Sequence, residues 1–246
     1  MRTLAVERTG RIWRLTLNRS QLGNAIDAAM VQEFDAVLSE GEASGIAGLV
    51  IQGAGRHFCT GFDLGALDGE TDDSLLARFV RVELLLQRIA QAPFTTVAMA
   101  HGRVIGAGAD LFTACRLRLA SSDAVISFPG ASGFGIVLGT RRLAQRVGVA
   151  TALEWVETGR TVASDEAVRC GLIDRLVDER PMAGCPIEAG MRDGAVRASL
   201  RRAAEPGSAA GDASDLEHLV RSAARHGLKD RIVSYVQTLQ SASSTK

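Results

Sequence analysis

The segment Gly106-Ala107-Gly108-Ala109-Asp110 constrains the fold of this chain more than any other stretch. It follows two apolar runs, residues 96–100 and 104–105, and it opens the mainly apolar stretch of residues 111–115. Small residues before a helix start leave backbone N–H groups uncovered, and these groups carry partial positive charge. The pattern therefore predicts a strand, a tight turn and a helix whose first amides can hold an oxygen that becomes negative during a reaction. Asp110 would stand beside that oxygen.

The rest of the first half alternates between strand and helix patterns. Residues 12–17 alternate like a half-buried strand, and residues 47–52 are typical of a buried one. Between them, Asp27 can cap a helix with an apolar stripe. That stripe consists of Met30, Phe34, Val37 and Leu38. Strands separated by helices favour an α/β fold.

A second helix and two further strands are predicted beyond residue 66. Residues 67–74 are small and acidic, which favours a loop, and Pro93 ends the helix that follows. Its apolar face consists of Leu75, Phe79, Val82, Leu86 and Ile89. Short strands are expected at residues 116–120 and 124–128.

The C-terminal third is predicted to be mostly helical. Ser164 is expected to cap a helix that Gly171 ends, and Pro and Gly residues within 178–190 indicate a linker. Helices are then expected over residues 191–204, 215–225 and 228–239, with a turn region at 206–211. We accordingly divide the chain into a core, residues 1–180, and a C-terminal helical region, residues 190–246.

Composition excludes several classes of protein. Lys+Arg and Asp+Glu are equal at 28 each, so no overall field attracts nucleic acid or a membrane surface. No apolar run approaches membrane-spanning length, and no signal-like segment opens the chain. Neither zinc-like spacing nor a disulfide ladder is formed by Cys59, Cys115, Cys170 and Cys185. We expect a cytoplasmic, reduced protein with no metal site, no nucleic-acid partner and no membrane association.

A second glycine-containing segment sharpens the interpretation. Arg56-His57-Phe58-Cys59-Thr60-Gly61-Phe62-Asp63-Leu64 follows an apolar run and a glycine turn. With residues 106–110, it resembles the paired motifs of the enoyl-CoA hydratase/isomerase family, the crotonase superfamily. The similarity continues through most of residues 1–180. It includes Arg19, Asn24, Ala25, Thr158-Gly159-Arg160-Thr161, Glu166-Ala167 and Gly171-Leu172-Ile173-Asp174.

The resemblance implies a fold, a substrate class and an assembly. The fold would be a spiral of ββα turns with a C-terminal helical region that completes an acyl pocket and packs between subunits. The substrate would be an acyl-CoA thioester, with coenzyme A as part of the substrate and no separate cofactor. The assembly would be a homotrimer or a hexamer built as a dimer of trimers.

The resemblance also implies which residues form the site. The backbone N–H groups of Phe62 and Ala107 would form an oxyanion hole, and Asp110 matches the first catalytic carboxylate, which is usually a glutamate. Small residues in the turn would let the thioester approach the main chain closely. The substrate-binding positions would be Ala25, Cys59, Gly61, Asp63, Leu64, Gly106 and Gly108.

One departure from the family pattern concerns the reaction. Hydratases of the family carry a second glutamate directly after a proline, where this chain has Gly130 after Pro129. Water addition needs one group to activate water and another to deliver a proton to the α-carbon. Double-bond isomerisation or decarboxylation therefore fits this chain better than efficient hydration. Alternatives are a catalytically impaired protein that binds CoA thioesters and a structural trimer without affinity for CoA.

Four other polar residues are given structural roles. His101 is expected to make a structural hydrogen bond, and Asp123 to be a turn acid. His57 is expected to be exposed or to contact a ligand phosphate. Arg103 is expected to pair with an acid such as Glu83, although a carboxylate on the acyl group is an alternative partner.

The glycine run does not fit a dinucleotide-binding fingerprint. No acidic residue ends a matching second strand at the distance that such a fingerprint requires.

Overall fold

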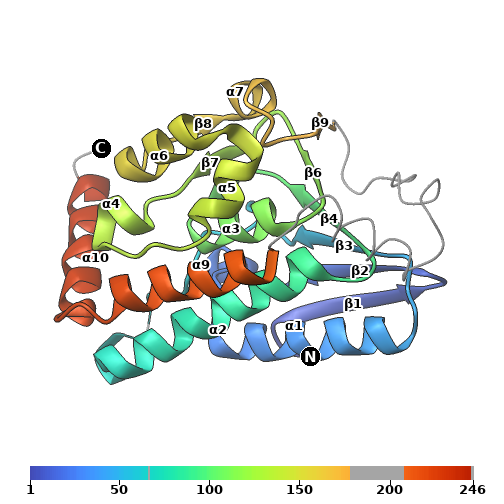
Figure 1. The fold of residues 1–246 in the computed structure, drawn as a ribbon, viewed down its shortest axis with the longest axis horizontal. Helices are drawn as coiled ribbons and strands as arrows, with labels where there is room; N and C mark the ends of the chain where they lie inside the picture. The colour runs from blue at the N-terminus through green and yellow to red at the C-terminus, as the bar shows by residue number, and fades with distance from the viewer. Residues whose placement is uncertain (66, 178–207, 245–246) are drawn as a thin grey trace.

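A large twisted sheet forms one side of the molecule in the computed structural model, which describes residues 1–65, 67–177 and 208–244 (Figure 1). Its strand order is β1-β2-β3-β4-β6-β9, and only β1 runs antiparallel to its neighbour. The strands are β1 (Leu4–Thr9), β2 (Ile12–Leu17), β3 (Gly48–Gly53), β4 (Thr95–Ala100), β6 (Leu117–Ala120) and β9 (Arg175–Leu176). The α/β organisation expected from the sequence is confirmed.

A second, smaller sheet alternates with the large one along the chain. It contains β5 (Arg103–Ile105), β7 (Val125–Ser127) and β8 (Val162–Ala163), in the order β5-β7-β8. The chain leaves the large sheet at β4, enters the small one at β5 and returns through a helix to β6. From β6 the chain enters the small sheet again at β7 and continues into further helices. Each of these two turns therefore consists of one strand from each sheet followed by a helical segment.

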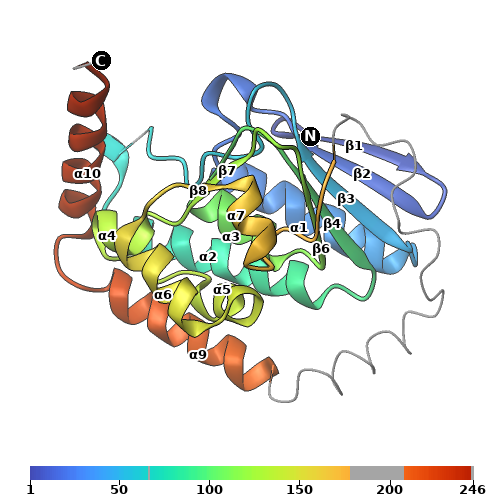
Figure 2. The ribbon, with the colours of Figure 1, turned by 90° about the horizontal axis from the view of Figure 1, so that it is seen from above.

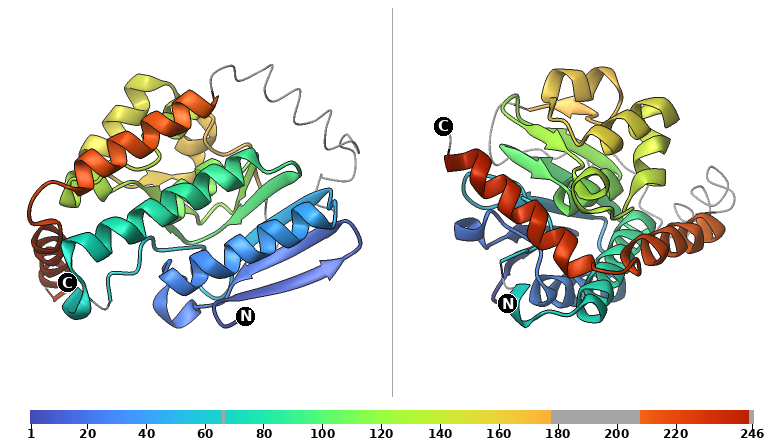
Figure 3. Two further views of the ribbon diagram at one scale, coloured as in Figure 1. Left: turned by 60° about the horizontal axis from the view of Figure 1, so that its bottom comes forward. Right: turned by 90° about the vertical axis from the view of Figure 1, so that its left-hand side faces the viewer.

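Helices pack on one face of the large sheet and along one end of the molecule. In Figure 3, α2 lies between α1 and α9, and Figure 2 places α10 beside α4 at the end of the molecule. The helical segments that precede β7 in the chain are η1 (Ser20–Leu22), α1 (Ala28–Ala43), η2 (Leu67–Gly69), α2 (Asp72–Gln91) and α3 (Ala107–Ala114). Those that follow are α4 (Gly130–Phe134), α5 (Thr140–Val147), α6 (Val149–Thr158), α7 (Ser164–Arg169), α9 (Ser208–Ala223) and α10 (Leu228–Ser244).

The first two long helices follow their sequence signals closely. Asp27 caps α1 by accepting a 2.7 Å hydrogen bond from the Met30 amide, and all four residues of the predicted stripe are buried. In α2 the five predicted apolar positions are buried as well. The prediction that residues 67–74 form a loop is wrong from Asp72 onward, because Thr71 and Ser74 make a capping box that starts α2 there.

Two predictions for the C-terminal third also need correction. Ser164 is not a cap: it is the first residue of α7, and its hydroxyl donates to the Ser122 carbonyl at 2.8 Å. The expected turn at 206–211 is wrong from Ser208 onward, where α9 already begins, and α10 extends to Ser244. The predicted linker at 178–190 and the predicted helix at 191–204 lie outside the described residues. No described helix is long and apolar enough to cross a membrane.

A buried cluster of ion pairs joins three helices, α2, α5 and α9. Glu83 of α2 is fully buried, and its carboxylate accepts two hydrogen bonds from Arg142 of α5, at 2.5 and 2.8 Å. Arg142 also lies 3.2 Å from Asp215 of α9, which in turn pairs with Arg141 at 2.8 Å. Because a buried charge needs a partner, this cluster fixes α9 against α2 and α5.

Replacing Glu83 with glutamine should destabilise the protein strongly. The buried Arg142 guanidinium would lose its principal counter-charge, a change that typically costs about 3–5 kcal/mol of unfolding free energy. Urea unfolding measures the loss. The matched control is Glu154→Gln, since Glu154 pairs with Arg160 at the surface and its removal should cost far less. Equal losses in both variants would contradict a structural role for the buried pair.

Candidate active site

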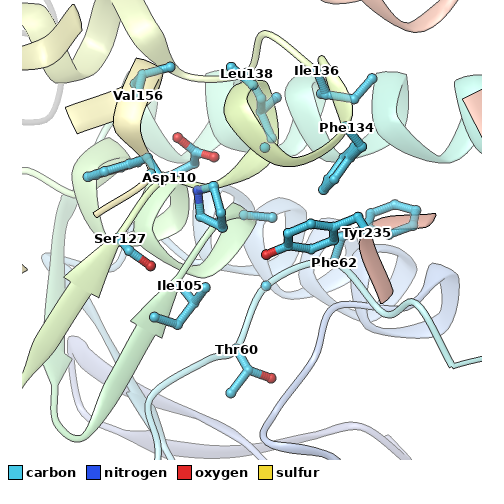
Figure 4. Close-up of a pocket in the computed structure, with 18 of the residues that line it drawn as sticks. Thr60, Phe62, Ile105, Asp110, Ser127, Phe134, Ile136, Leu138, Val156 and Tyr235 are labelled. Carbon is cyan, nitrogen blue, oxygen red and sulfur yellow. The ribbon is translucent and has the colours of Figure 1, made fainter. Parts of the chain in front are cut away.

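A cavity of about 560 Å³ lies where the two glycine-containing segments meet α4, α6 and α10 (Figure 4). Its volume falls in the range of small-molecule binding sites. Phe62, Ala107 and Asp110, the three residues predicted to do the chemistry, all line it. The structure therefore brings together residues that are up to 48 positions apart in the sequence.

The Phe62 amide is left available by the way its segment pairs. Ile26 donates its amide to the Gly61 carbonyl at 2.7 Å, and Asp63 donates to the Ile26 carbonyl at 2.9 Å. This parallel bridge uses backbone atoms on either side of Phe62, so the Phe62 N–H is directed away from Ile26. It donates to no other residue in the described part of the chain.

The Ala107 amide is available for a different reason. Ala107 is the first residue of α3, and an amide at this position has no partner within its own helix. The preceding Gly106 adopts a φ of +52° and donates its own amide to the Ser127 carbonyl at 2.9 Å, which anchors the turn to β7. Among the described residues, none accepts a hydrogen bond from the Ala107 N–H.

Glycine lets the two segments approach each other closely. A side chain at Gly61 would place its Cβ 2.9 Å from the Ile105 carbonyl oxygen and 3.6 Å from the Ala107 nitrogen. The φ of Gly61 is +104°, which a residue with a side chain rarely adopts. Both features require glycine, and they place the residue before Phe62 directly against the turn that carries Ala107.

The Phe62 side chain holds its segment in place. Its ring stacks on Phe79 of α2, with centroids 4.1 Å apart, and the Arg78 guanidinium lies over it at 4.3 Å. Arg78 also donates to the Asp63 carbonyl at 3.0 Å and pairs with Glu70. The backbone around the Phe62 amide is therefore fixed from α2 through both the ring and the main chain.

Asp110 is a buried carboxyl with an unsatisfied oxygen. It lies in the first turn of α3, and its Oδ1 makes no hydrogen bond to any described residue. Gly139 packs directly on this oxygen, where a Cβ would collide. Burial raises the pKa of Asp110 well above its usual range; the Arg142 charge opposes this rise and the Glu83 charge adds to it. Asp110 can therefore hold a proton at a pH where ordinary carboxyls have lost theirs.

Within the described residues, Asp110 is the only carboxyl group in the cavity wall. Gly130 begins α4 and lines the cavity without contributing a polar side chain. Ser127 contributes a hydroxyl from the end of β7, and Figure 4 shows it on the same side of the cavity as Ile105. No group of three or more potential metal ligands occurs in the described parts of the chain.

The predicted binding residues divide into two groups. Gly61, Leu64 and Gly106 line the cavity. The others make contacts elsewhere: Cys59 is fully buried against Gly108, and Arg19 binds both the Asp63 carboxylate, at 2.8 Å, and the Ala25 carbonyl. Burial raises the pKa of Cys59 to about 12, so its thiol is not a nucleophile. The predicted binding residues Ala25, Cys59, Asp63 and Gly108 therefore do not line the described cavity.

The structural roles predicted for other polar residues are partly confirmed. His101 makes the expected structural hydrogen bond, with its Nε2 3.0 Å from the Gly55 carbonyl oxygen. His57 is half-buried rather than exposed, and its Nδ1 accepts a hydrogen bond from the Arg103 amide. The predicted pairing of Arg103 with Glu83 is wrong, because Glu83 pairs with Arg142 and Arg103 lines the cavity.

Comparison with known proteins identifies the family. The model of the enoyl-CoA hydratase/isomerase family matches residues 7–191. A crystal structure described as an enoyl-CoA hydratase/isomerase from Bordetella parapertussis shares 38% identity with a TM-score of 0.88, over 95% of this chain and 98% of that one. The chain belongs to the enoyl-CoA hydratase/isomerase family. Its fold is the crotonase fold with a C-terminal helical region.

Two relatives of this family member carry names of different reactions. The peroxisomal Delta(3,5)-Delta(2,4)-dienoyl-CoA isomerase of Arabidopsis thaliana is 32% identical over 67% of this chain and 65% of its own length. The ethylmalonyl-CoA decarboxylase of Rattus norvegicus is 34% identical over 66% of this chain and 56% of its own length. The alignments with several curated relatives cover about three fifths of those proteins.

Sequence reasoning missed part of the cavity wall of this enoyl-CoA hydratase/isomerase family protein. Tyr235 and Leu239 reach it from α10, and Phe134 reaches it from α4. The helical pattern of residues 228–239 indicated a helix but not which of its side chains would face the site. Only the packing of α10 against α4 decides that.

The buried Asp110 should give the protein a distinct pH dependence of stability. Because its pKa is raised in the folded state, the folded protein keeps this proton to a higher pH than the unfolded chain does. Stability should therefore fall as the pH rises above about 4, until the folded-state carboxyl itself ionises. Urea unfolding of wild type and Asp110→Asn at about pH 5 and about pH 8 isolates this contribution. Between about pH 5 and about pH 8, Asp110→Asn should lose less unfolding free energy than wild type. Identical losses in the two proteins would contradict the raised pKa of Asp110.

Proposed function

We propose that this protein is an acyl-CoA enzyme that stabilises a thioester enolate in a backbone oxyanion hole. The amides of Phe62 and Ala107 would donate to the thioester oxygen, and Asp110 would move a proton. Coenzyme A would enter as part of the substrate, with no separate cofactor. The observation that carries the proposal is that Phe62 and Ala107, whose amides donate to no described residue, lie on segments in direct contact and line one cavity with the buried Asp110.

The physical basis is the charge that develops on the thioester oxygen. Removing a proton or CO₂ from the α-carbon sends an electron pair toward the carbonyl, and the oxygen becomes negative. Two amides fixed in place before the reaction stabilise that oxygen without reorganisation, and each contributes about 3–4 kcal/mol in comparable acyl-transfer sites. The glycine contacts and the Phe62 ring stack supply this fixed geometry.

The acid inventory favours isomerisation or decarboxylation over hydration. Asp110 is the one carboxyl group that the described residues bring to the cavity. By its resemblance to the family motif, Gly130 takes the position at which hydratases of the family carry the second carboxyl. In an isomerisation one group can remove a proton and return it at another carbon. In a decarboxylation CO₂ leaves, and a neutral Asp110 protonates the enolate carbon. The raised pKa of Asp110 supports its role as a proton donor.

The absence of a side chain at Gly130 also supports a second candidate, a protein that binds CoA thioesters without turning them over. In either case the C-terminal region, residues 190–246, would close the pocket and contribute to a homotrimer or a hexamer. The protein would work in the cytoplasm.

Replacing Ala107 with proline should slow enolate formation strongly while leaving the fold intact. Proline is well tolerated at the first position of a helix, where its missing N–H removes no helical hydrogen bond. We expect exchange of the α-protons of butyryl-CoA with deuterated solvent to slow by about 10²–10³-fold, the usual cost of one oxyanion donor. Mass spectrometry measures the exchange.

The control for this variant is Ala107→Ser, which keeps the amide and should exchange at a rate close to wild type. Thermal unfolding of both variants checks the fold. Equal rates in the two variants would exclude the Ala107 amide as a donor. Absence of exchange in wild type, together with tight binding of butyryl-CoA, would favour the binding protein.

Hydration of crotonyl-CoA by the wild-type protein should be slow. With one carboxyl in the described cavity wall, no second group activates water while Asp110 delivers the proton. Loss of the enone absorbance measures the reaction. A turnover number within the usual enzyme range of about 1–10³ s⁻¹ would show that the single carboxyl suffices and would overturn the preference for isomerisation or decarboxylation.

A further inference from the structure

Four aromatic rings form one continuous wall of the cavity. Phe62 stacks on Phe79 with centroids 4.1 Å apart, Phe79 lies 6.2 Å from Phe134, and Phe134 lies 5.3 Å from Tyr235. All four residues line the cavity, although they come from the Phe62 loop, α2, α4 and α10. Such spacings are typical of aromatic rings that attract one another through their edges and faces. A further ring placed in the cavity would extend the same series of contacts.

Tyr235 is the only tyrosine in the sequence and the polar member of this wall. Its ring packs on α4 so closely that a Cβ at Gly133 would lie 2.7 Å from it. Figure 4 shows its hydroxyl directed into the cavity. This hydroxyl makes no hydrogen bond to another residue in the described part of the chain. Burial raises the pKa of Tyr235, so the phenol stays protonated and can donate.

The neighbours of this hydroxyl do not explain its presence. Phe134, Ile136, Leu138 and Leu239 line the cavity with side chains that offer no hydrogen-bonding group. The described lining also contains polar side chains, Thr60, Arg103, Asp110, Ser127 and Thr161, but none of them forms a hydrogen bond with the Tyr235 hydroxyl. An apolar residue would fill the position equally well if only an alkyl chain had to be bound. A polar group that faces an apolar cavity gains most when the ligand supplies its partner.

We propose that this cavity binds an aromatic acyl group that bears a hydrogen-bonding oxygen, and that the Tyr235 hydroxyl is the group that recognises this oxygen. The aromatic ring of the acyl group packs against this wall, and Tyr235 donates to its oxygen substituent. A ring also loses fewer internal rotations on binding than an alkyl chain of equal carbon number. The inference rests on the proposed function, because it assumes that a CoA thioester occupies the cavity.

Binding of saturated thioesters tests the proposal without requiring turnover. The probes are nonanoyl-CoA, 3-phenylpropanoyl-CoA and the 3-(3-hydroxyphenyl)- and 3-(4-hydroxyphenyl)propanoyl-CoA isomers, each titrated into the full chain by calorimetry. Wild type should bind phenylpropanoyl-CoA more tightly than nonanoyl-CoA. At least one hydroxylated isomer should bind about three- to tenfold more tightly still, as expected for one hydrogen bond.

Two variants separate the ring from the hydroxyl. Tyr235→Phe should keep the preference for a ring over the alkyl chain and lose the gain from the hydroxyl. Tyr235→Leu should weaken both, and thermal unfolding checks that each variant folds. Two results would overturn this inference and leave the proposed function standing. One is that Tyr235→Phe still binds the hydroxylated thioester more tightly than 3-phenylpropanoyl-CoA. The other is that wild type binds all four thioesters with equal affinity. Failure of wild type to bind any of the four would instead overturn the proposed function itself.

Discussion

The site depends on the direct packing of backbone against backbone where residues 59–62 meet residues 105–108. A Cβ at Gly61 would lie 2.9 Å from the Ile105 carbonyl oxygen, and one at Gly108 would lie 2.5 Å from the Cys59 carbonyl oxygen. Neither contact tolerates a side chain, so glycine at both positions sets the separation of the two segments. The amides of Phe62 and Ala107 belong to these segments, and their availability follows from the bridge to Ile26 and from the start of α3.

The second constraint is electrostatic. Asp110 is buried against Gly139, near the Arg142 guanidinium, whose charge is already shared by Glu83 and Asp215. Arg142 therefore opposes the rise in the pKa of Asp110 without cancelling it, because burial is the larger effect. The same ion-paired cluster fixes α9 to α2 and α5. The protonation of the candidate catalytic acid and the packing of the C-terminal region thus share one group, Arg142.

The C-terminal helices supply what the spiral core lacks. The core residues provide the amides and the carboxyl, but the described cavity remains incomplete without Tyr235 and Leu239 of α10. Helix α10 is held against α4 and α2, and Asp72 accepts hydrogen bonds from the amides of residues 227–229 at its start. Different parts of the chain therefore determine two properties of the proposed enzyme. The spiral core determines the chemistry proposed for the oxyanion hole, and the C-terminal helices help to determine which acyl group the cavity can accept.

Local signals determined much of this structure. The Asp27 cap and the apolar faces of α1 and α2 were predictable, because a helix repeats its contacts every three to four residues whatever it packs against. The turn at residues 106–108 and the place of Asp110 in the first turn of a helix were also predictable, because adjacent residues encode turns and helix starts. Tertiary structure alone decided that Ser164 donates to Ser122 rather than capping α7, that Glu83 pairs with Arg142 rather than Arg103, and that Tyr235 faces the cavity. Each of these contacts joins residues more than 40 positions apart, and their distance is set by how the layers pack rather than by neighbouring residues.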